Sequence, residues 1–144
     1  IKGIDSTNRT TEATMKADSS FTVKEKLYTH GNQVADTDFV VDMNGEGCSA
    51  DVMSRSVASE NSIQRFVSTM NGNAPCHGHT ECDAIIMDEA TVSAIPEITA
   101  NHIDASLIHE AAIGKIAGEQ LIKLMSLGLT EEEAEEQIIN GFLR

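Results

Sequence analysis

The sequence has few aromatic residues and few basic ones. Its 144 residues include no tryptophan, one tyrosine and four phenylalanines. A core must therefore be built from Ile, Val, Leu, Met and Ala, and the length is enough for one domain with such a core. Ten Lys and Arg stand against 23 Asp and Glu, which gives a formal net charge of −13. This balance argues against a nucleic-acid partner, because phosphate binding needs clustered basic side chains.

The chain also lacks long apolar runs and a full set of cysteines. No uninterrupted apolar stretch approaches the roughly 18 residues of a membrane span, and the opening IKGIDSTNRTTEATMK has no apolar signal-peptide region. Three cysteines cannot complete a disulfide framework, and so low a count fits thiols kept reduced in the cytosol. We therefore expect a cytoplasmic protein that has no membrane partner. Because the chain starts at Ile1 rather than at methionine, we expect a fragment or a processed product.

Three segments differ in their residue pattern. Residues 1–20 are polar and rich in Ser and Thr, and we expect a loop or the remnant of a larger unit there. Residues 21–113 alternate short apolar and polar stretches with Gly, Asn and Asp between them, which is typical of strands separated by turns. The stretches that read as strands are FTVKEKLYTHG, DFVVDMNGEG, SIQRFVSTMNGN and CDAIIMDEATVSAIPEI. From residue 114 to 144 the apolar residues recur with a helical period instead.

A short pattern recurs within the strand-rich segment. The stretch FVVDMNG, which starts at Phe39, returns twenty-seven positions later as FVSTMNG, which starts at Phe66. Periods of roughly 20–50 residues are typical of solenoids, in which each coil buries one face against the next. A sandwich of hairpins with a chance similarity is the alternative. The recurrence alone leaves both architectures open.

The C-terminal segment reads as two amphipathic helices. KIAGEQLIKLMSLG carries its apolar residues near one face, with Gly128 placed to end the helix. In LTEEEAEEQIINGFLR, Thr130 and Glu133 have the spacing of a capping box, and acidic residues occupy the first turn, where the helix dipole favours them. The apolar stripe of this second helix consists of Ala134, Ile138 and Phe142. Such a stripe belongs mostly to a core, although a terminal helix pair can also bind a partner.

Metal-binding residue types are dense in PCHGHTEC, from Pro75 to Cys82. The pair His77 and His79 would lie on one face of a strand and could bind zinc. Cys76 and Cys82 would face the other way, and no second pair of ligands appears elsewhere. The residue order also differs from that of zinc deaminases, in which H-x-E precedes P-C-x-x-C. Zinc binding by His77 and His79 is one alternative, and a buried Cys76 with exposed turn histidines is another.

From about Arg55 onward the chain resembles the SufB/SufD family of iron–sulfur cluster assembly proteins, especially its shorter stand-alone members. The resemblance is carried by NAPCHGHTECDAIIMD, SAIPEI and LIHEAAIGKIAGEQLIKLMSLGLTEEEAEEQIINGF, about half of the chain. It implies a right-handed parallel β-helix, here residues 21–113, followed by a C-terminal helical segment at 114–144. Family members are longer, so the chain looks like a C-terminal portion of one.

The resemblance also implies a set of site residues. In SufB-type proteins one cysteine and one downstream glutamate are implicated in cluster building, in motifs that match Cys82 in TECD and Glu110 in IHEA. SufD-type proteins have a functional histidine nearby, and His109 is its nearest match. Iron–sulfur clusters are held by cysteine thiolates, with imidazole or carboxylate as less common ligands. Cys82, His109 and Glu110 are therefore expected to bind metal or cluster, with Cys82 and Glu110 in the reacting roles.

The offset between the two recurring stretches also separates Cys82 from His109 and from Arg55. If each coil has that length, Cys82 and His109 lie on neighbouring strands, about 4.8 Å apart. Arg55 would then stand beside Cys82 and lower the pKa of its thiol, which favours the thiolate.

The function implied is that of a scaffold subunit for iron–sulfur cluster assembly, not an enzyme with its own turnover. Its cluster would be assembled and released rather than permanently held, and the isolated fragment could hold none. The expected partners are an ABC-type ATPase subunit that hydrolyses ATP, a sulfur donor protein, and a second copy or a paralogue. Two alternatives remain open. One is a structural or interaction module without metal chemistry, and the other is a zinc protein that uses His77 and His79.

Overall fold

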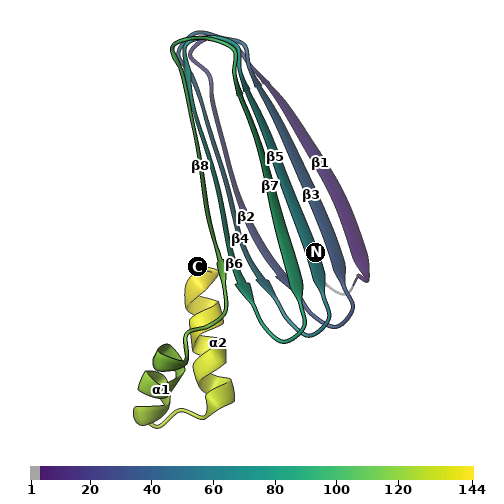
Figure 1. Cartoon of the computed structure of the whole chain (residues 1–144), viewed down its shortest axis with the longest axis vertical. Helices are drawn as coiled ribbons and strands as arrows, with labels where there is room; N and C mark the ends of the chain where they lie inside the picture. Colours follow the sequence, from purple (N-terminus) through teal and green to yellow (C-terminus); the bar gives the residue numbers. More distant parts are fainter. Residues whose placement is uncertain (1–3) are drawn as a thin grey trace.

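The computed structural model describes residues 4–144, in which the strands form two parallel sheets that face each other (Figure 1). One sheet has the order β1-β3-β5-β7 and the other β2-β4-β6-β8. The strands are β1 Ser6–Met15, β2 Ser20–Thr29, β3 Val34–Met43, β4 Cys48–Ala58, β5 Ile63–Gly72, β6 Cys76–Ile86, β7 Thr91–Ala100 and β8 Ala105–Gly114. Each coil contributes one strand to each sheet, so the expected parallel β-helix is confirmed and the sandwich of hairpins is excluded.

The strand register corrects the length of the coil. Ser20 and Ser49 pair on β2 and β4, and their hydrogen-bonded side chains are 29 apart in the numbering. Asp51 and His79 pair on β4 and β6, and their side chains, also in contact, are 28 apart. A coil is therefore 28 or 29 residues long. The coil length of twenty-seven residues that the sequence predicted is wrong.

The recurrence in the sequence has a different structural origin. Phe39 pairs with Ser68 and Phe66 pairs with Thr37, so the two phenylalanines are not register partners. Both side chains are nevertheless buried, and their ring centroids lie 5.9 Å apart. The repeated pattern thus reflects two aromatic rings that pack diagonally inside the solenoid.

The N-terminal polar segment contributes the first strand rather than a loop. β1 runs from Ser6 to Met15 and pairs with β3 along its whole length, and residues 1–3 of the expected segment lie outside the described part of the chain. Arg9 on β1 contacts the Glu25 carboxylate at the open end of the first coil. Glu25 also accepts hydrogen bonds from Thr37 and Ser54. A polar, charged group therefore occupies the inside of the first coil.

The interior is apolar at one end of the strands and polar at the other. Near the turns that follow β3 and β5, it is filled by large apolar side chains such as Met43 and Met70, both fully buried. Towards the other turns it holds a hydrogen-bonded polar group. The Gln64 amide donates to Thr29 Oγ1 at 2.8 Å and to the Val57 carbonyl at 2.9 Å. Buried polar groups of this kind are stable when each one has a partner.

A ladder of asparagine side chains marks the same turn in three successive coils. The amide of Asn73 donates to Asn44 Oδ1 at 2.7 Å, and the amide of Asn101 donates to Asn73 Oδ1 at the same distance. Each asparagine directly follows a strand of the β1-β3-β5-β7 sheet. Because an amide side chain can both donate and accept, the ladder fixes neighbouring coils in one register.

The C-terminal segment forms two helices at one end of the solenoid (Figure 1). These are α1, Gly118–Ser126, and α2, Glu131–Phe142. The predicted capping box is confirmed, because Thr130 Oγ1 accepts from the Glu133 amide and the Glu133 carboxylate accepts from the Thr130 amide. Gly128 lies between the helices with φ of +99°, a conformation that favours glycine. None of the helices in residues 4–144 is both long and apolar enough to cross a membrane.

Candidate functional site

The stretch PCHGHTEC lies at the start of β6, and its residues are divided between the two faces of that strand. Cys76 and Cys82 are buried in the interior, while His77 is exposed and His79 is half-buried on the outer face. This division follows from the two-residue period of a strand. The residues of this dense stretch therefore contribute to two different environments on opposite sides of one sheet.

Gly78, between the two histidines, allows the interior to close behind them. A Cβ atom at Gly78 would lie 2.6 Å from Leu107 Cδ2 and 3.1 Å from the sulfur atoms of Met43 and Met70. No side chain fits there unless its neighbours move. The inner face of β6 is thus packed tightly at the glycine, four residues before Cys82.

Cys82 is enclosed in the solenoid, where its thiol is neutral. The residue is 1 % exposed and lies in register between Ser54 on β4 and Ala111 on β8. Burial, which has the largest effect, and the charges of Asp83 and Glu25 together raise the pKa of its thiol to about 11. At neutral pH the thiol is therefore protonated and shielded from water.

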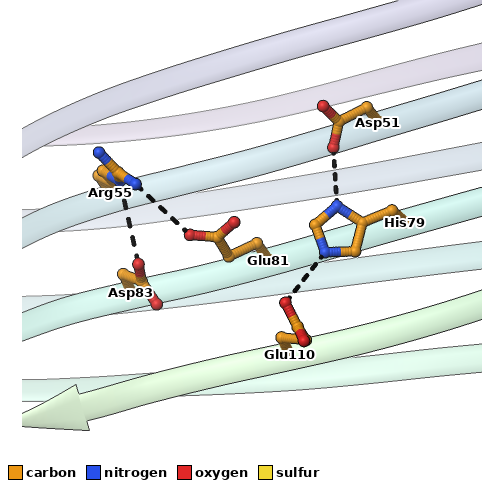
Figure 2. A network of polar contacts seen from close by, with 6 residues as sticks. All are labelled: Asp51, Arg55, His79, Glu81, Asp83 and Glu110. Carbon is orange, nitrogen blue, oxygen red and sulfur yellow. Dashed lines mark hydrogen bonds and ion pairs between the residues drawn. The ribbon is translucent and has the colours of Figure 1, made fainter.

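Arg55 does not have the position that the sequence offset predicted. It pairs in register with Asp83 and lies on the outer face of the sheet. Its guanidinium lies 3.7 Å from the Glu81 carboxylate and 3.9 Å from that of Asp83 (Figure 2). The expectation that this cation lowers the pKa of Cys82 is wrong, because the true register places Arg55 beside Asp83 and faces it outward.

His109 faces the interior on β8, as Cys82 does on β6, but the two residues are not in register. Its register partner is Thr80, and Cys82 pairs with Ala111, two residues further along β8. Burial lowers the pKa of the half-buried His109 and the nearby His79 lowers it further, while the Thr80 backbone acts in the opposite direction. The ring is therefore neutral at pH 7. Its Nδ1 atom is enclosed and has no hydrogen-bond partner within residues 4–144.

Glu110 points to the outer face, away from Cys82 and His109. It pairs in register with Glu81, and its Oε2 atom lies 3.4 Å from His79 Nε2. The other ring nitrogen of His79, Nδ1, lies 2.9 Å from Asp51 Oδ1 (Figure 2). The hydrogen bond with Asp51 is the main cause of the raised pKa of His79, and the one with Glu110 also raises it, while burial acts in the opposite direction.

Two further acidic residues of β6, Glu81 and Asp83, complete the network on the outer face. The neighbouring Asp83 carboxyl group is the largest cause of the raised pKa of Glu81, followed by burial. Arg55, on the neighbouring strand, lowers the same pKa. One ligand atom each from His79, Glu81 and Glu110 lie within 4.8 Å of one another. We call these three residues the outer ligand group.

The two sides of the sheet thus carry different donor atoms. The inner side offers a sulfur and a nitrogen, from Cys82 and His109, and the outer side offers a nitrogen and carboxylate oxygens. Of the residues expected from the sequence, Cys82 and His109 share the interior, and Glu110 is separated from them by the backbone. His77 is outside the outer ligand group.

Sequence reasoning missed the roles of Asp51 and Glu81. In the true register Asp51 pairs with His79 across β4 and β6, and Glu81 pairs with Glu110 across β6 and β8. A correct coil length would have aligned both pairs in advance. That length was the missing signal.

Comparison with known proteins identifies one family. The family described as "SUF system FeS cluster assembly, SufBD core domain" matches residues 3–142. An iron–sulfur cluster assembly SufBD family protein of Methanothermobacter thermautotrophicus is 38% identical over 114 residues, which cover 78% of this chain and 28% of the relative. One of Methanocaldococcus jannaschii is 35% identical over 133 residues, which cover 92% of this chain and 42% of the relative. The chain thus spans less than half the length of either relative.

Proposed function

The chain belongs to the SufBD core family of iron–sulfur cluster assembly proteins, and from this premise we propose that it acts as a scaffold on which a cluster is built. The observation that carries the proposal is the enclosure of Cys82 and His109 on the inner face of two neighbouring strands, β6 and β8. Glu110 follows His109 directly and faces the opposite side of the same sheet. On this proposal the protein has no turnover of its own.

The ligand types suit a cluster that must later leave. Cys82 would accept sulfur or bind iron through its thiolate, the preferred ligand of such clusters. The Nδ1 atom of His109 has no partner within the described residues, so it is free to bind a metal ion. Glu110 faces the other side of the sheet, so it would act as an oxygen ligand to iron on that side or move a proton. Few and mixed ligands hold a cluster less firmly than four thiolates would, which favours its transfer.

The burial of Cys82 sets a condition on this chemistry. A thiol with a pKa of about 11 is a poor nucleophile and a poor metal ligand at neutral pH, because the thiolate is the reactive form. Access to Cys82 must therefore be opened during assembly. In register, β8 covers one side of Cys82 with Ala111, which has only a methyl side chain and is itself exposed. We propose that a displacement of β8 opens this access.

The partner that drives this opening is proposed to be an ABC-type ATPase subunit bound to α1 and α2. Apolar side chains on and just after α1 support this assignment, since Ile122 is 68% exposed and Leu127 is 76% exposed. Exposed apolar side chains that gather into one patch mark interaction surfaces, and these two residues are only five positions apart. Deletion of residues 115–144 should abolish binding to the ATPase while the β-rich circular dichroism stays largely intact. Binding that persists in the truncated chain would contradict the assignment.

Two other partners belong to the proposal. A sulfur donor protein would carry the sulfur as a cysteine persulfide. The Cys82 thiolate would attack its outer sulfur atom, the S–S bond of the donor would break, and the donor cysteine would leave as a thiolate. A second copy of the chain or a paralogue would complete a dimer, and the apolar residues exposed on the last coil support such an interface. These residues are Ile95, Ile98, Ile108 and Ile113. The cytoplasm, with its reduced thiols, is the proposed location.

Anaerobic reconstitution with iron and sulfide tests the scaffold. We expect an iron–sulfur absorption that is lost in Cys82→Ser and in Glu110→Ala and weakened in the His109→Ala variant. Cys48→Ser is the matched control, because Cys48 is another buried thiol on the inner face and should be dispensable. Melting temperatures of all variants separate loss of assembly from loss of folding. If Cys82→Ser assembles a cluster as well as the unaltered chain does, the scaffold mechanism is wrong.

The two alternative functions give different results in the same experiment. A structural or interaction module would bind neither iron nor zinc. A zinc protein that uses His77 and His79 would keep stoichiometric zinc in Cys82→Ser and lose it in His77→Gln. The position of His77 outside the outer ligand group makes this zinc pair the weaker alternative.

A further inference from the structure

We propose that His79, Glu81 and Glu110, the outer ligand group, bind one divalent transition metal ion on the outer face of the β4-β6-β8 sheet, separately from Cys82. The binding of an ion there does not depend on the scaffold function. The identity of the ion as iron(II), held before it enters a cluster, does rest on the proposed function.

The geometry of the sheet brings the three donors together without a loop. Glu81 and Glu110 are register partners on β6 and β8, and His79 lies two residues before Glu81 on the same face. One donor atom from each residue lies within 4.8 Å of the others. Donor atoms that share an ion at about 2.1 Å from it are at most about 4.2 Å apart. Small rotations of the partly exposed side chains would therefore close the site, while the backbone stays as it is.

Asp51 orients His79 in the way that metal-binding histidines are usually held. Its carboxylate lies 2.9 Å from His79 Nδ1, so this nitrogen carries the hydrogen and donates it. The other nitrogen, Nε2, lies 3.4 Å from Glu110, as Figure 2 shows, and a metal ion bound there would replace its hydrogen. A carboxylate bound to the far ring nitrogen of a histidine fixes the ring and increases its strength as a ligand. This carboxylate comes from a third strand, β4, and adds a supporting residue to the three ligands.

The charges around the site favour a cation. Four carboxylates, those of Asp51, Glu81, Asp83 and Glu110, surround His79 and the guanidinium of Arg55. Arg55 contacts Glu81 and Asp83 but has no contact with Asp51 or Glu110 among its ion pairs within residues 4–144. A divalent ion between His79, Glu81 and Glu110 would neutralise Glu110, which Arg55 does not contact, and would share Glu81 with Arg55.

The donor set also limits which ions fit. One imidazole nitrogen with two carboxylate oxygens suits iron(II), manganese(II), cobalt(II) or zinc. Magnesium and calcium prefer oxygen ligands alone, and copper(I) prefers sulfur. Iron(II) at this position would lie on the opposite side of β6 from Cys82. Cys82 is only three residues from His79 along the chain.

Anaerobic titration of the chain with cobalt(II), followed by its visible absorption, tests the site. We expect one equivalent to bind, and competition with iron(II) to displace it. His79→Gln and Glu81→Gln should each weaken cobalt binding by roughly 100-fold or more, and Asp51→Asn by roughly 10–100-fold because it removes only the support of the ring. His77→Gln is the matched control. His77 lies on the same strand and face but outside the group, so cobalt affinity should not change.

Cys82→Ser distinguishes this site from the scaffold function. Cobalt should bind to that variant as it does to the unaltered chain, without a sulfur-to-cobalt charge-transfer band. Loss of cobalt binding in Cys82→Ser, or unchanged binding in His79→Gln and Glu81→Gln, would overturn the outer site. So would the absence of binding to the unaltered chain at millimolar cobalt. If cobalt binds as proposed but Cys82→Ser still assembles a cluster, the scaffold mechanism fails while the outer site stands. Circular dichroism of each variant checks that the solenoid is intact.

Discussion

The two faces of β6 differ in their chemistry, although successive residues of one short stretch alternate between them. On the inner face, burial keeps the Cys82 thiol protonated by raising its pKa, and on the adjoining strand it keeps the His109 ring neutral by lowering its pKa. On the outer face the carboxylates around His79 raise its pKa and so favour the charged ring. The pKa of a histidine is thus raised on one side of the sheet and lowered on the other. Desolvation dominates inside, and hydrogen bonds to carboxylates dominate outside.

The difference teaches how a solenoid can keep two metal-binding chemistries apart with very short sequence motifs. In HTECD, a strand needs only alternation to send a soft sulfur ligand inward and hard oxygen ligands outward. The backbone between them prevents one ion from using both sets. Any process that passes a metal from the outer face to Cys82 must therefore move a strand or go around an edge of the sheet, and the edge strand next to Cys82 is β8.

The largest expected contrast between the faces is in thiol reactivity. At pH 7 a pKa of about 11 instead of 9.0 reduces the thiolate fraction about 100-fold, before steric shielding is considered. We expect Cys82 in the folded chain to react with iodoacetamide more than roughly 100-fold slower than in the unfolded chain. Mass spectrometry of peptides after timed labelling measures the ratio. Rapid labelling of Cys82 in the folded chain would mean that the inner face is open in solution.

Alkaline pH should destabilise the folded chain through the Cys82 thiol. Because the pKa of Cys82 is raised on folding, its stabilising contribution is complete below pH 9 and is lost as the pH rises towards 11. Two pKa units correspond to at most about 2.7 kcal/mol of unfolding free energy. Urea unfolding at pH 8 and pH 11 measures the change. Cys82→Ser, which does not titrate in this range, should lose less stability than the unaltered chain between the two values.

A methyl group at Gly78 should disturb the inner packing without altering any charge. Its Cβ would meet Leu107, Met43 and Met70, so Gly78→Ala should lower the unfolding free energy by about 1–3 kcal/mol. Chemical denaturation measures this change. His77→Ala, one residue earlier on the exposed face, should change stability by less than about 0.5 kcal/mol. Equal effects of both substitutions would show that the inner face is no more tightly packed than the outer one.

The smallest effect is expected on the outer face. Arg55 is partly exposed, and its ion pairs with Glu81 and Asp83 are 3.7 and 3.9 Å long. Arg55→Gln should therefore cost less than about 1 kcal/mol, and added salt should reduce the difference further. Urea unfolding at low and high ionic strength measures both. A loss of several kcal/mol that does not depend on salt would mean that Arg55 is a packing residue.

The fold class and the helical tail could be predicted from the sequence, because they rest on a family resemblance and on local patterns such as the capping box. Three strands were missed for a physical reason. β4 places serines, including Ser54 and Ser56, at buried positions, and β1 is polar along most of its length. β8, on the last coil, has no fully buried residue. In all three the alternation that normally identifies a strand is weak.

The candidate site was predicted in part, and its errors follow from the coil length. The offset read from the sequence aligned Cys82 with His109, whereas the true register aligns Thr80 with His109. An error of two residues keeps the face of a strand unchanged, so both side chains still point inward. The outer ligand group needed the register itself, since the pairing of Glu81 with Glu110 leaves no local signal in the sequence. The roles of Cys82, His109 and Glu110 stay predictions until the variants are measured.

The asparagine ladder offers the coils that begin with β3, β5 and β7 the same template while the chain folds. Each new coil must close a loop of nearly the same length, so the entropy cost of adding a coil hardly varies along the solenoid. Asn44, Asn73 and Asn101 repeat one turn contact from coil to coil. Growth can therefore start at an interior coil and spread in both directions, because each strand pairs with strands of the neighbouring coils. In such a chain a local defect slows the coils beyond it and leaves those already stacked intact.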